Sequence, residues 1–325
     1  MNKNSRIYVT GSSGLVGSAV IRALQQQGYT DITRSTRTKV YHNGFSYDGN
    51  YDLRYEENTK EIFKQFKPEY VINAAGKVGG INANNTQSAE FIRDNIMMQT
   101  NIINMSYVYG VKKLLFLGSS CIYPRECPQP IKESYLLTSA LEETNIGYAI
   151  AKISGMVMCR MYNKQYGSNF ISAMPTNLYG PYDNFHLTNS HVLPALIRKF
   201  HDAKIRGDEK VEFWGTGTPR REFLFVDDLA DALIFLMNNY DDCKEHINIG
   251  TGEDITIKDL VQLIKEIVDY DGKIIWNVSY PDGTMVKRLD CSKINSLGWR
   301  ARTSLESGLK LTYDWFVRNY NNIRK

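Results

Sequence analysis

The sequence predicts a doubly wound α/β fold, with a parallel sheet and a smaller α/β domain toward the C-terminus. Short apolar runs alternate with stretches whose apolar residues recur every three or four positions, which is typical of successive βαβ units. A glycine-rich turn joins the first apolar run to the first of these stretches. After about residue 175 the alternation gives way to segments rich in Pro, Gly and Asn, which indicates a change of architecture.

The composition is that of an ordinary globular protein. Of the 325 residues, 42% are hydrophobic and 23% are charged, which excludes disordered and collagen-like chains. The formal net charge is only +4 and no run of like charges stands out, so we expect neither nucleic acid nor a membrane surface as a partner. No uncharged apolar run approaches the ~18 residues of a membrane span, and no signal-peptide core precedes the first glycine.

The cysteines predict a cytoplasmic location. They are odd in number, form no CxxC pair and have no histidine cluster at zinc spacing, so we expect no metal site. Scattered cysteines of this kind are typical of free thiols in a reducing compartment. The five residues are Cys121, Cys127, Cys159, Cys243 and Cys291.

The first half of the chain predicts a parallel sheet that is covered on both faces. A β-rich run at residues 6–10 precedes a helix whose apolar face begins at Leu15 and whose stop signal is Gly28. The alternation then recurs along the chain. We expect a helix at 61–66, a buried strand at 70–75, a helix at 91–108 and a strand at 113–117.

The change near residue 175 predicts two domains. We assign residues 1–175 to a nucleotide-binding domain and residues 176–325 mainly to a substrate-binding domain. Turn-rich segments such as those at 175–181, 214–219 and 280–284 suit a substrate-holding lobe. A strand-like run at 221–226, followed by a helix at 227–238, is expected to return to the first domain.

A phosphate-binding loop is predicted between the first strand and the first helix. The sequence TGSSGLVG at residues 10–17 places glycines at 11, 14 and 17, the spacing of a Rossmann-type dinucleotide site. Gly11 permits a tight turn, Gly14 lets backbone N–H groups approach a pyrophosphate, and Gly17 lets the helix pack against the strand. A glycine-rich turn without a ligand is the alternative. The predicted contacts are Gly11, Ser12, Ser13, Gly14, Leu15, Val16 and Gly17.

The end of the second strand predicts NADP(H) as the cofactor. We expect this strand to end near Thr33, where an NAD site would carry Asp or Glu for the ribose hydroxyl. The sequence instead reads RSTR at residues 34–37, and the guanidinium of Arg37 matches a 2′-phosphate. A solvated surface arginine is the alternative. Residues 38–51 are predicted to form a loop or a hairpin.

Two further motifs predict proton-coupled hydride transfer. GSSCIYP at residues 118–124 follows a buried strand, so its side chains are expected at the carboxyl edge of the sheet. Tyr148 and Lys152 are four residues apart, which places a phenol and an ammonium on one helix face. Because a nearby cation favours a phenolate, Lys152 is expected to lower the pKa of Tyr148 from its usual value of about 10.

Together these motifs resemble the extended short-chain dehydrogenase/reductase family. Within that family the chain is similar, nearly end to end, to the enzymes that epimerise and reduce GDP-4-keto-6-deoxy-D-mannose. The similarity is carried by AGKVGG at 75–80 with NNT at 84–86, GSSCIYP at 118–124, PTNLYGP at 175–181, DNFH at 183–186, NSH at 189–191 and WGTGTPRREF at 214–223.

The resemblance implies roles for the catalytic residues. Ser119, Tyr148 and Lys152 would act on the C4 carbonyl, and Cys121 and His191 would perform the epimerisations at C3 and C5. Thiol and imidazole groups both titrate near neutrality, as removal of a proton beside a ketone requires. Which of the two acts as base is open, as are structural roles for Cys121 as a buried filler and for His191 as a satisfied histidine or cofactor contact.

The resemblance also implies binding residues and an assembly. A GDP-sugar would be the substrate, and the helices at 91–108 and 148–166 would pair in a homodimer. Cofactor contacts would be Asp52, Leu53, Leu117, Gly118, Ser120, Lys152, Pro175, Thr176, Asn177, Leu178 and His191. Substrate contacts would be Lys199, Trp214, Arg221 and Asp290.

The chain departs from the family pattern at three places. Ser13 stands where several members have Arg, which leaves Arg37 with less help at a 2′-phosphate. Lys199 replaces a common Arg, and the segment at 38–51 is longer than expected.

Other functions on this fold are a 4,6-dehydratase, a 4-epimerase and a nucleotide-binding regulator without activity. A dehydratase typically carries an acidic pair where this chain has Cys121 and Ile122. A 4-epimerase needs no Cys/His pair. A binding protein has no physical reason to keep Ser119, Tyr148 and Lys152 together.

Overall fold

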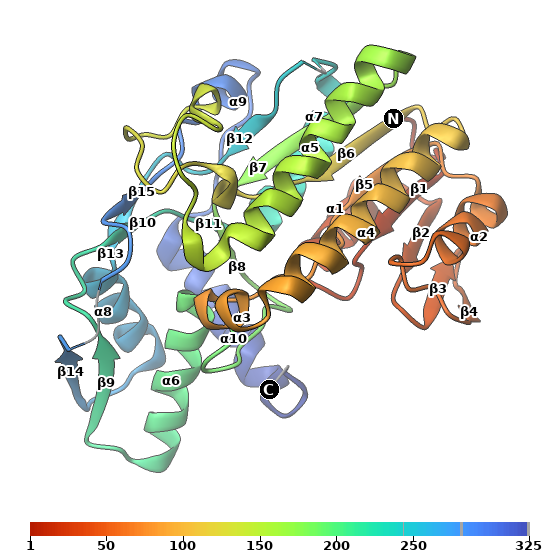
Figure 1. The fold of residues 1–325 in the computed structure, drawn as a ribbon. Helices are drawn as coiled ribbons and strands as arrows, with labels where there is room; N and C mark the ends of the chain where they lie inside the picture. The colour runs from red at the N-terminus through yellow and green to blue at the C-terminus, as the bar shows by residue number, and fades with distance from the viewer. Residues whose placement is uncertain (243, 280–281, 324–325) are drawn as a thin grey trace.

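The computed structural model describes residues 1–242, 244–279 and 282–323. Cys243, one of the predicted free thiols, and Tyr280 and Pro281, part of a predicted turn, lie outside the described residues. A large sheet has the strand order β12-β7-β6-β5-β1-β2-β3-β4, and helices cover both of its faces (Figure 1). Three small sheets lie to one side of it. The predicted α/β fold is confirmed.

Six strands of the large sheet run parallel to one another. β6 and β7 are buried at every residue, as expected for strands covered on both faces. Parallel strands present all their carboxyl ends at one edge, and the candidate site lies there. The six are β1 (Ile7–Thr10), β2 (Ile32–Ser35), β5 (Tyr70–Asn73), β6 (Lys113–Leu117), β7 (Phe170–Pro175) and β12 (Ile247–Ile249).

An antiparallel hairpin completes the sheet beyond β2. Its strands are β3 (Lys39–His42) and β4 (Phe45–Asp48), so the segment at 38–51 is a hairpin and not an open loop. Asn43 and Gly44 at its turn both have positive φ, 48° and 83°, as a type I′ turn requires. β2 continues two residues past the predicted end at Thr33, because the hairpin supplies hydrogen-bonding partners as far as Ser35.

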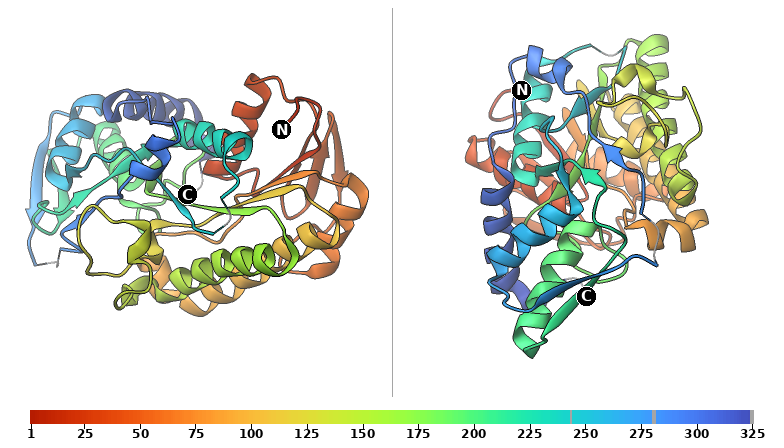
Figure 2. Two further views of the ribbon diagram at one scale, coloured as in Figure 1. Left: turned by 90° about the horizontal axis from the view of Figure 1, so that it is seen from above. Right: turned by 90° about the vertical axis from the view of Figure 1, so that its left-hand side faces the viewer.

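Long helices form two layers around the sheet (Figures 1 and 2). α1 packs against α7 on one face, and α4 packs against α5 on the other, with α2 beside α4. The predicted helices form, although α2 and α4 begin five and three residues earlier than expected, at Glu56 and Ser88. Bounds are α1 (Leu15–Gln26), α2 (Glu56–Phe66), α3 (Ile81–Thr86), α4 (Ser88–Val108), α5 (Ile146–Tyr166) and α7 (Val226–Asn239).

The C-terminal part has its own apolar core between α6, α8 and α10, around Phe200, Leu260 and Phe316. Its helices are α6 (Val192–Arg206), α8 (Ile257–Val268), α9 (Ser292–Ser296) and α10 (Leu305–Asn319). Its strand pairs are β8 (Asn177–Tyr179) with β11 (Phe223–Phe225) and β9 (Lys210–Trp214) with β14 (Lys273–Asn277). β10 (Arg220–Arg221) lies between β13 (Ile255–Thr256) and β15 (Val286–Lys287). Short 3₁₀ helices are η1 (Ser120–Ile122), η2 (Glu133–Tyr135), η3 (Glu143–Asn145) and η4 (Tyr320–Asn322).

The strand predicted at 221–226 is interrupted at Glu222, which separates β10 from β11. After β11 the chain returns to the first core through α7, and β12 then becomes an edge strand of the large sheet. A domain boundary at residue 175 stays a prediction. Within the described part of the chain, no helix is long and apolar enough to cross a membrane.

Candidate active site

The glycine loop forms a cradle at the N-terminus of α1. Gly11 has φ +65°, and a Cβ there would lie 2.9 Å from the Ala74 carbonyl oxygen. A Cβ on Gly17 would collide with the Gly11 carbonyl, so helix and loop approach closely only because both residues are glycine. Gly14 precedes α1, and no side chain of the described residues caps this helix, which leaves N–H groups of its first turn for an anion. The cradle fits a pyrophosphate.

The loop also contacts the end of β2, where the adenosine half of a dinucleotide would lie. The Ser12 hydroxyl donates to the Ser35 carbonyl at 2.8 Å, which brings the loop within two residues of Arg37. Arg37 and Ser13 are exposed, and residues 34–37 carry no carboxylate. These features fit a cofactor with a 2′-phosphate.

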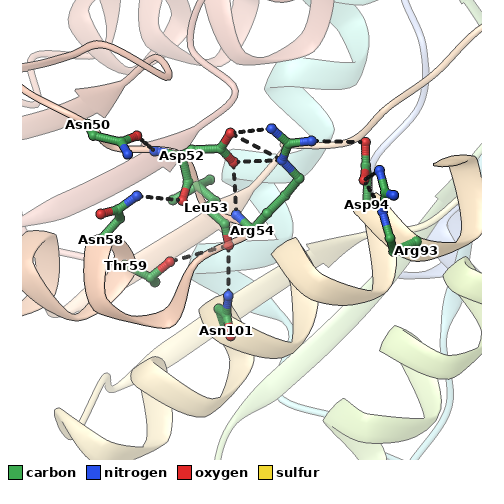
Figure 3. Close-up of polar contacts among 9 residues, drawn as sticks. All are labelled: Asn50, Asp52, Leu53, Arg54, Asn58, Thr59, Arg93, Asp94 and Asn101. Atoms are coloured by element: carbon green, nitrogen blue, oxygen red, sulfur yellow. Dashed lines mark hydrogen bonds and ion pairs between the residues drawn. The ribbon is translucent and has the colours of Figure 1, made fainter.

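A charged network fixes the neighbouring segment at 52–54 (Figure 3). The Arg54 guanidinium binds both Asp52 oxygens, with Nη2 to Oδ2 at 2.6 Å, and reaches the buried Asp94 on α4 at 3.4 Å. Arg54 is the largest cause that lowers the pKa of Asp52, and Arg37 adds a smaller effect in the same direction. The Leu53 carbonyl accepts from Asn101 at 2.9 Å. Asp52 and Leu53, both predicted cofactor contacts, are therefore held against α4 by Arg54 and Asn101, which sequence analysis did not single out.

The predicted catalytic serine and tyrosine meet beside the end of β6. Ser119 precedes η1, where its hydroxyl accepts from the Cys121 N–H at 3.2 Å, and its side chain lies close enough to the Tyr148 phenol to oppose the rise in that residue's pKa. Tyr148 is only 7% exposed and packs edge-on against Phe91, with 6.4 Å between the ring centroids. Burial raises the pKa of Tyr148. The phenol is thus protonated at neutral pH and is placed to donate its proton.

Lys152 does not act on Tyr148 in the predicted way. Its ammonium donates to the Leu117 carbonyl at 2.8 Å and lies 5.8 Å from the centre of the Tyr148 ring. Burial lowers the pKa of Lys152 to about 8. The prediction that Lys152 lowers the pKa of Tyr148 is wrong for this structure, because loss of hydration outweighs a cation that is engaged elsewhere.

A lysine that sequence analysis missed lies near both predicted epimerisation residues. The Lys287 ammonium is 3.8 Å from the Cys121 sulfur, and Cys121 packs beside Tyr148 and Phe91. Surrounding protein lowers the pKa of His191, although the residue as a whole is exposed, and the charge of Lys287 adds to this lowering. Lys287 is 166 residues from Cys121 in the chain, so no local pattern could have revealed it.

The segment that carries His191 is fixed by a second glycine motif. The Gly80 N–H donates to the Asn189 carbonyl at 2.9 Å, and a Cβ on Gly80 would collide with the Ser190 carbonyl. Gly80 lies directly before α3, and α4, the next helix, carries Phe91. The motifs at 75–80 and 189–191 thus meet in one contact, which fixes the turn directly before His191.

The remaining predicted cofactor contacts lie at the carboxyl ends of β6 and β7. Leu117 is the last residue of β6, and Gly118 and Ser120 follow it. Pro175 ends β7, and Leu178 lies in β8. The side chains of Thr176 and Asn177 both donate to the Glu222 carbonyl, Asn177 at 2.8 Å.

The predicted substrate contacts do not all converge. The Lys199 ammonium donates to the Glu212 carbonyl and lies 5.0 Å from the Phe213 ring, directly before the exposed Trp214. Arg221 is the strand partner of Lys287. Asp290 instead accepts from the Ser292 N–H at 2.8 Å, and its own N–H bonds the Ile131 carbonyl. Asp290 therefore bonds to residues 131 and 292, whereas Lys199 bonds to Glu212 and Arg221 pairs with Lys287.

Comparison with known proteins agrees with this geometry. Residues 7–250 match the family described as "NAD dependent epimerase/dehydratase family". The chain is 54% identical to GDP-L-fucose synthase 1 of Arabidopsis thaliana over 99% of its own length and 96% of the relative. It is 46% identical to GDP-L-fucose synthase of Escherichia coli over 98% of each chain. A crystal structure of a GDP-L-fucose synthetase from Naegleria fowleri bound to NADP aligns with TM-score 0.88 and 30% identity, over 100% of this chain and 98% of the other.

The Arg54 network generates a prediction about stability. Replacing Arg54 with Met leaves the buried Asp52 and Asp94 without their shared cation, so we expect a loss of about 3 kcal/mol in unfolding free energy at pH 7. Because the folded pKa of Asp52 is lowered, its contribution is present above the unfolded pKa of about 4 and is lost as pH falls through the folded value. Urea unfolding at several pH values should show the loss shrinking in acid.

Arg93→Met is the matched control, because the Arg93 side chain is 60% exposed and, among the described residues, pairs only with Asp94. We expect it to cost less than about 1 kcal/mol. Equal losses for the two variants, or a loss for Arg54→Met that does not change with pH, would contradict the assigned role of the network.

Proposed function

The chain belongs to the NAD-dependent epimerase/dehydratase family, and we propose that it makes GDP-L-fucose from GDP-4-keto-6-deoxy-D-mannose. The conversion epimerises C3 and C5 and reduces C4 with NADPH. The observation that carries the proposal is the placement of Cys121 and its neighbour Lys287 beside Tyr148 and Ser119. Identities of 46–54% with named GDP-L-fucose synthases over nearly the whole chain support it.

NADPH is the proposed cofactor, and when bound it supplies the hydride that C4 accepts. The glycine loop would hold its pyrophosphate and Arg37 its 2′-phosphate. Residues at the ends of β6 and β7 would line the nicotinamide half, with Lys152 beside them at the Leu117 carbonyl. The structural relative bound to NADP supports this choice.

For the reduction, Tyr148 delivers the proton to the C4 oxygen. Burial holds the phenol in its protonated form, and Ser119, which lies beside that phenol, would bind the same oxygen. With its pKa near 8, Lys152 retains most of its charge at neutral pH, and its bond to the Leu117 carbonyl would hold that charge beside the nicotinamide half of the cofactor.

For the epimerisations, Cys121 and His191 exchange the protons next to the ketone. The C4 carbonyl makes those protons acidic, and inversion needs a base on one face of the sugar and an acid on the other. The ammonium of Lys287 lies 3.8 Å from the Cys121 sulfur, within hydrogen-bonding reach of it. The lowered pKa of His191 keeps the imidazole neutral at pH 7, so it is able to accept a proton.

The diphosphate of the substrate is proposed to lie against Arg221 and Lys287. The two cations are partners on neighbouring strands, and neither forms a salt bridge with the carboxylates described in this structure. A nucleoside diphosphate would supply the missing negative charge. Lys199 and Trp214, which lie at α6 and the end of β9, would contact the GDP moiety.

A homodimer in the cytoplasm is proposed as the working form. Exposed apolar side chains lie along α4 and α5, the neighbouring helices that cover one face of the sheet (Figure 2). They are Met97, Tyr107, Val108, Ile146, Ile150, Met161 and Tyr166. Free thiols at Cys121, Cys127, Cys159 and Cys291 support the cytoplasmic location.

The proposed function is tested by incubating the protein with NADPH and GDP-4-keto-6-deoxy-D-mannose. We expect one NADPH to be oxidised per GDP-L-fucose formed, with the sugar identified by NMR. Oxidation of NADPH with only unepimerised sugar, or no oxidation at all, would contradict it.

Cys121→Ser is predicted to stop most of the epimerisation. A hydroxyl is a far weaker base than a thiolate near neutral pH, whereas the volume of the side chain hardly changes. In the same assay the variant is expected to reduce the unepimerised ketone to a different 6-deoxysugar. GDP-L-fucose formed at the rate of the unaltered protein would show that Cys121 is only a packing residue.

Arg37→Ala is predicted to impair the use of NADPH far more than that of NADH. Loss of one charge-assisted contact costs about 1.5–3 kcal/mol, which corresponds to roughly tenfold to more than a hundredfold in affinity. The kcat/KM values for the two cofactors measure the effect. Arg34→Ala is the control, because Arg34 stacks on the Tyr41 ring at 4.8 Å and should leave both values unchanged. Equal losses with NADPH and NADH would show that Arg37 does not contact the phosphate.

A further inference from the structure

Glu222 is a buried carboxylate to which the reaction assigns no role. It is fully buried at the break between β10 and β11. One oxygen accepts from the Thr251 and Gly252 N–H groups at 2.7 and 2.8 Å, and the other accepts from the Leu289 N–H at 2.8 Å. Within the described part of the chain it pairs with no Lys or Arg, so its short hydrogen bonds all come from backbone donors, with a longer contact of 3.4 Å from the Thr251 hydroxyl.

The backbone of Glu222 contacts a third segment. Its carbonyl accepts from the Asn177 amide at 2.8 Å and from the Thr176 hydroxyl at 3.4 Å, at the end of β7 where the cofactor is expected. One residue therefore joins the cofactor loop, the loop after β12 and the segment at 286–290.

Glu222 lies next to the two cations that are proposed to bind the diphosphate. Arg221 precedes it in the chain, and Lys287 lies two residues before Leu289. β10 and β15 pair through only two residues each, so this contact has little ladder hydrogen bonding of its own. The bond from the Leu289 N–H to the Glu222 carboxylate holds the chain immediately beyond β15.

We propose that Glu222 is a positioning residue for the GDP-sugar diphosphate, because its carboxylate fixes the segment of Lys287 relative to Arg221. This inference rests on the proposed function. A neutral amide would not serve equally well, since a Gln side chain accepts hydrogen bonds at only one of its two ends. Its NH₂ group would face either the Leu289 N–H or the pair at Thr251 and Gly252, and the segment would shift.

Glu222→Gln tests the proposal in the full-length protein. We expect titration calorimetry to show binding of GDP weakened by roughly tenfold or more, as for loss of one charge-assisted contact, with a matching rise in KM for the keto sugar. The affinity for NADPH should stay unchanged, because the backbone carbonyl that binds Thr176 and Asn177 is retained. If this variant folds poorly, Glu222→Asp, which keeps the charge but shortens its reach, should show the same selective loss.

Asp228→Asn is the matched control. Asp228, on α7, accepts hydrogen bonds from the backbone N–H groups of Arg302 and Thr303 and from the Thr303 hydroxyl. These residues are not part of the candidate site. The Asp228→Asn variant should have a lower melting temperature but an unchanged affinity for GDP. Unchanged GDP binding in Glu222→Gln, or equal weakening of GDP and NADPH, would overturn the positioning role. Failure of the unaltered protein to bind GDP would instead contradict the proposed function, and this inference with it.

Discussion

Loss of hydration at the carboxyl edge of the large sheet sets the chemistry of the site. Tyr148 and Lys152 emerge from one helix into the region beside β6, and both are buried there. Burial is the largest cause of both pKa shifts and moves the two values apart, upward for the phenol and downward for the ammonium. A protonated acid and a cation of modest basicity therefore lie side by side without any contact between their polar atoms. Phe91 on α4 covers Tyr148 and contributes to this burial.

The two halves of the site are built by different kinds of interaction. The cofactor half is made of short local motifs, in which glycines allow backbone segments to approach one another and Arg54 fixes a turn against α4. The substrate half depends on contacts between distant segments, such as Lys287 with Cys121 and Leu289 with Glu222. A buried carboxylate such as that of Glu222 lowers the stability of the fold unless each of its hydrogen-bond donors stays in place. Its main effect is therefore to fix the relative positions of the segments that carry those donors.

The same distinction explains what could be predicted from the sequence. Periodicity located the strands and long helices to within a few residues, because apolar spacing reflects the burial of each element. Pairing between distant segments determines the order of the strands, the hairpin next to β2 and the break at Glu222. The sequence predicted one continuous strand where this break occurs. Residues in local motifs could be proposed for the site from the sequence, and they stay predictions. Arg54, Lys287 and Glu222 were not singled out, since their partners lie far away in the chain or in sequence without a recognisable motif. The expected effect of Lys152 on Tyr148 failed for a related reason: spacing gives proximity but not the direction of a hydrogen bond.

We propose that one site holds separate groups for epimerisation and for reduction. NMR of GDP-4-keto-6-deoxy-D-mannose incubated in D₂O with Tyr148→Phe, a variant that lacks only the phenolic oxygen, tests this separation. We expect deuterium uptake at C3 and C5 at close to the rate of the unaltered protein, with no oxidation of added NADPH. Oxidation of NADPH at the unaltered rate, or loss of deuterium uptake together with reduction in a variant that still folds and binds cofactor, would contradict it.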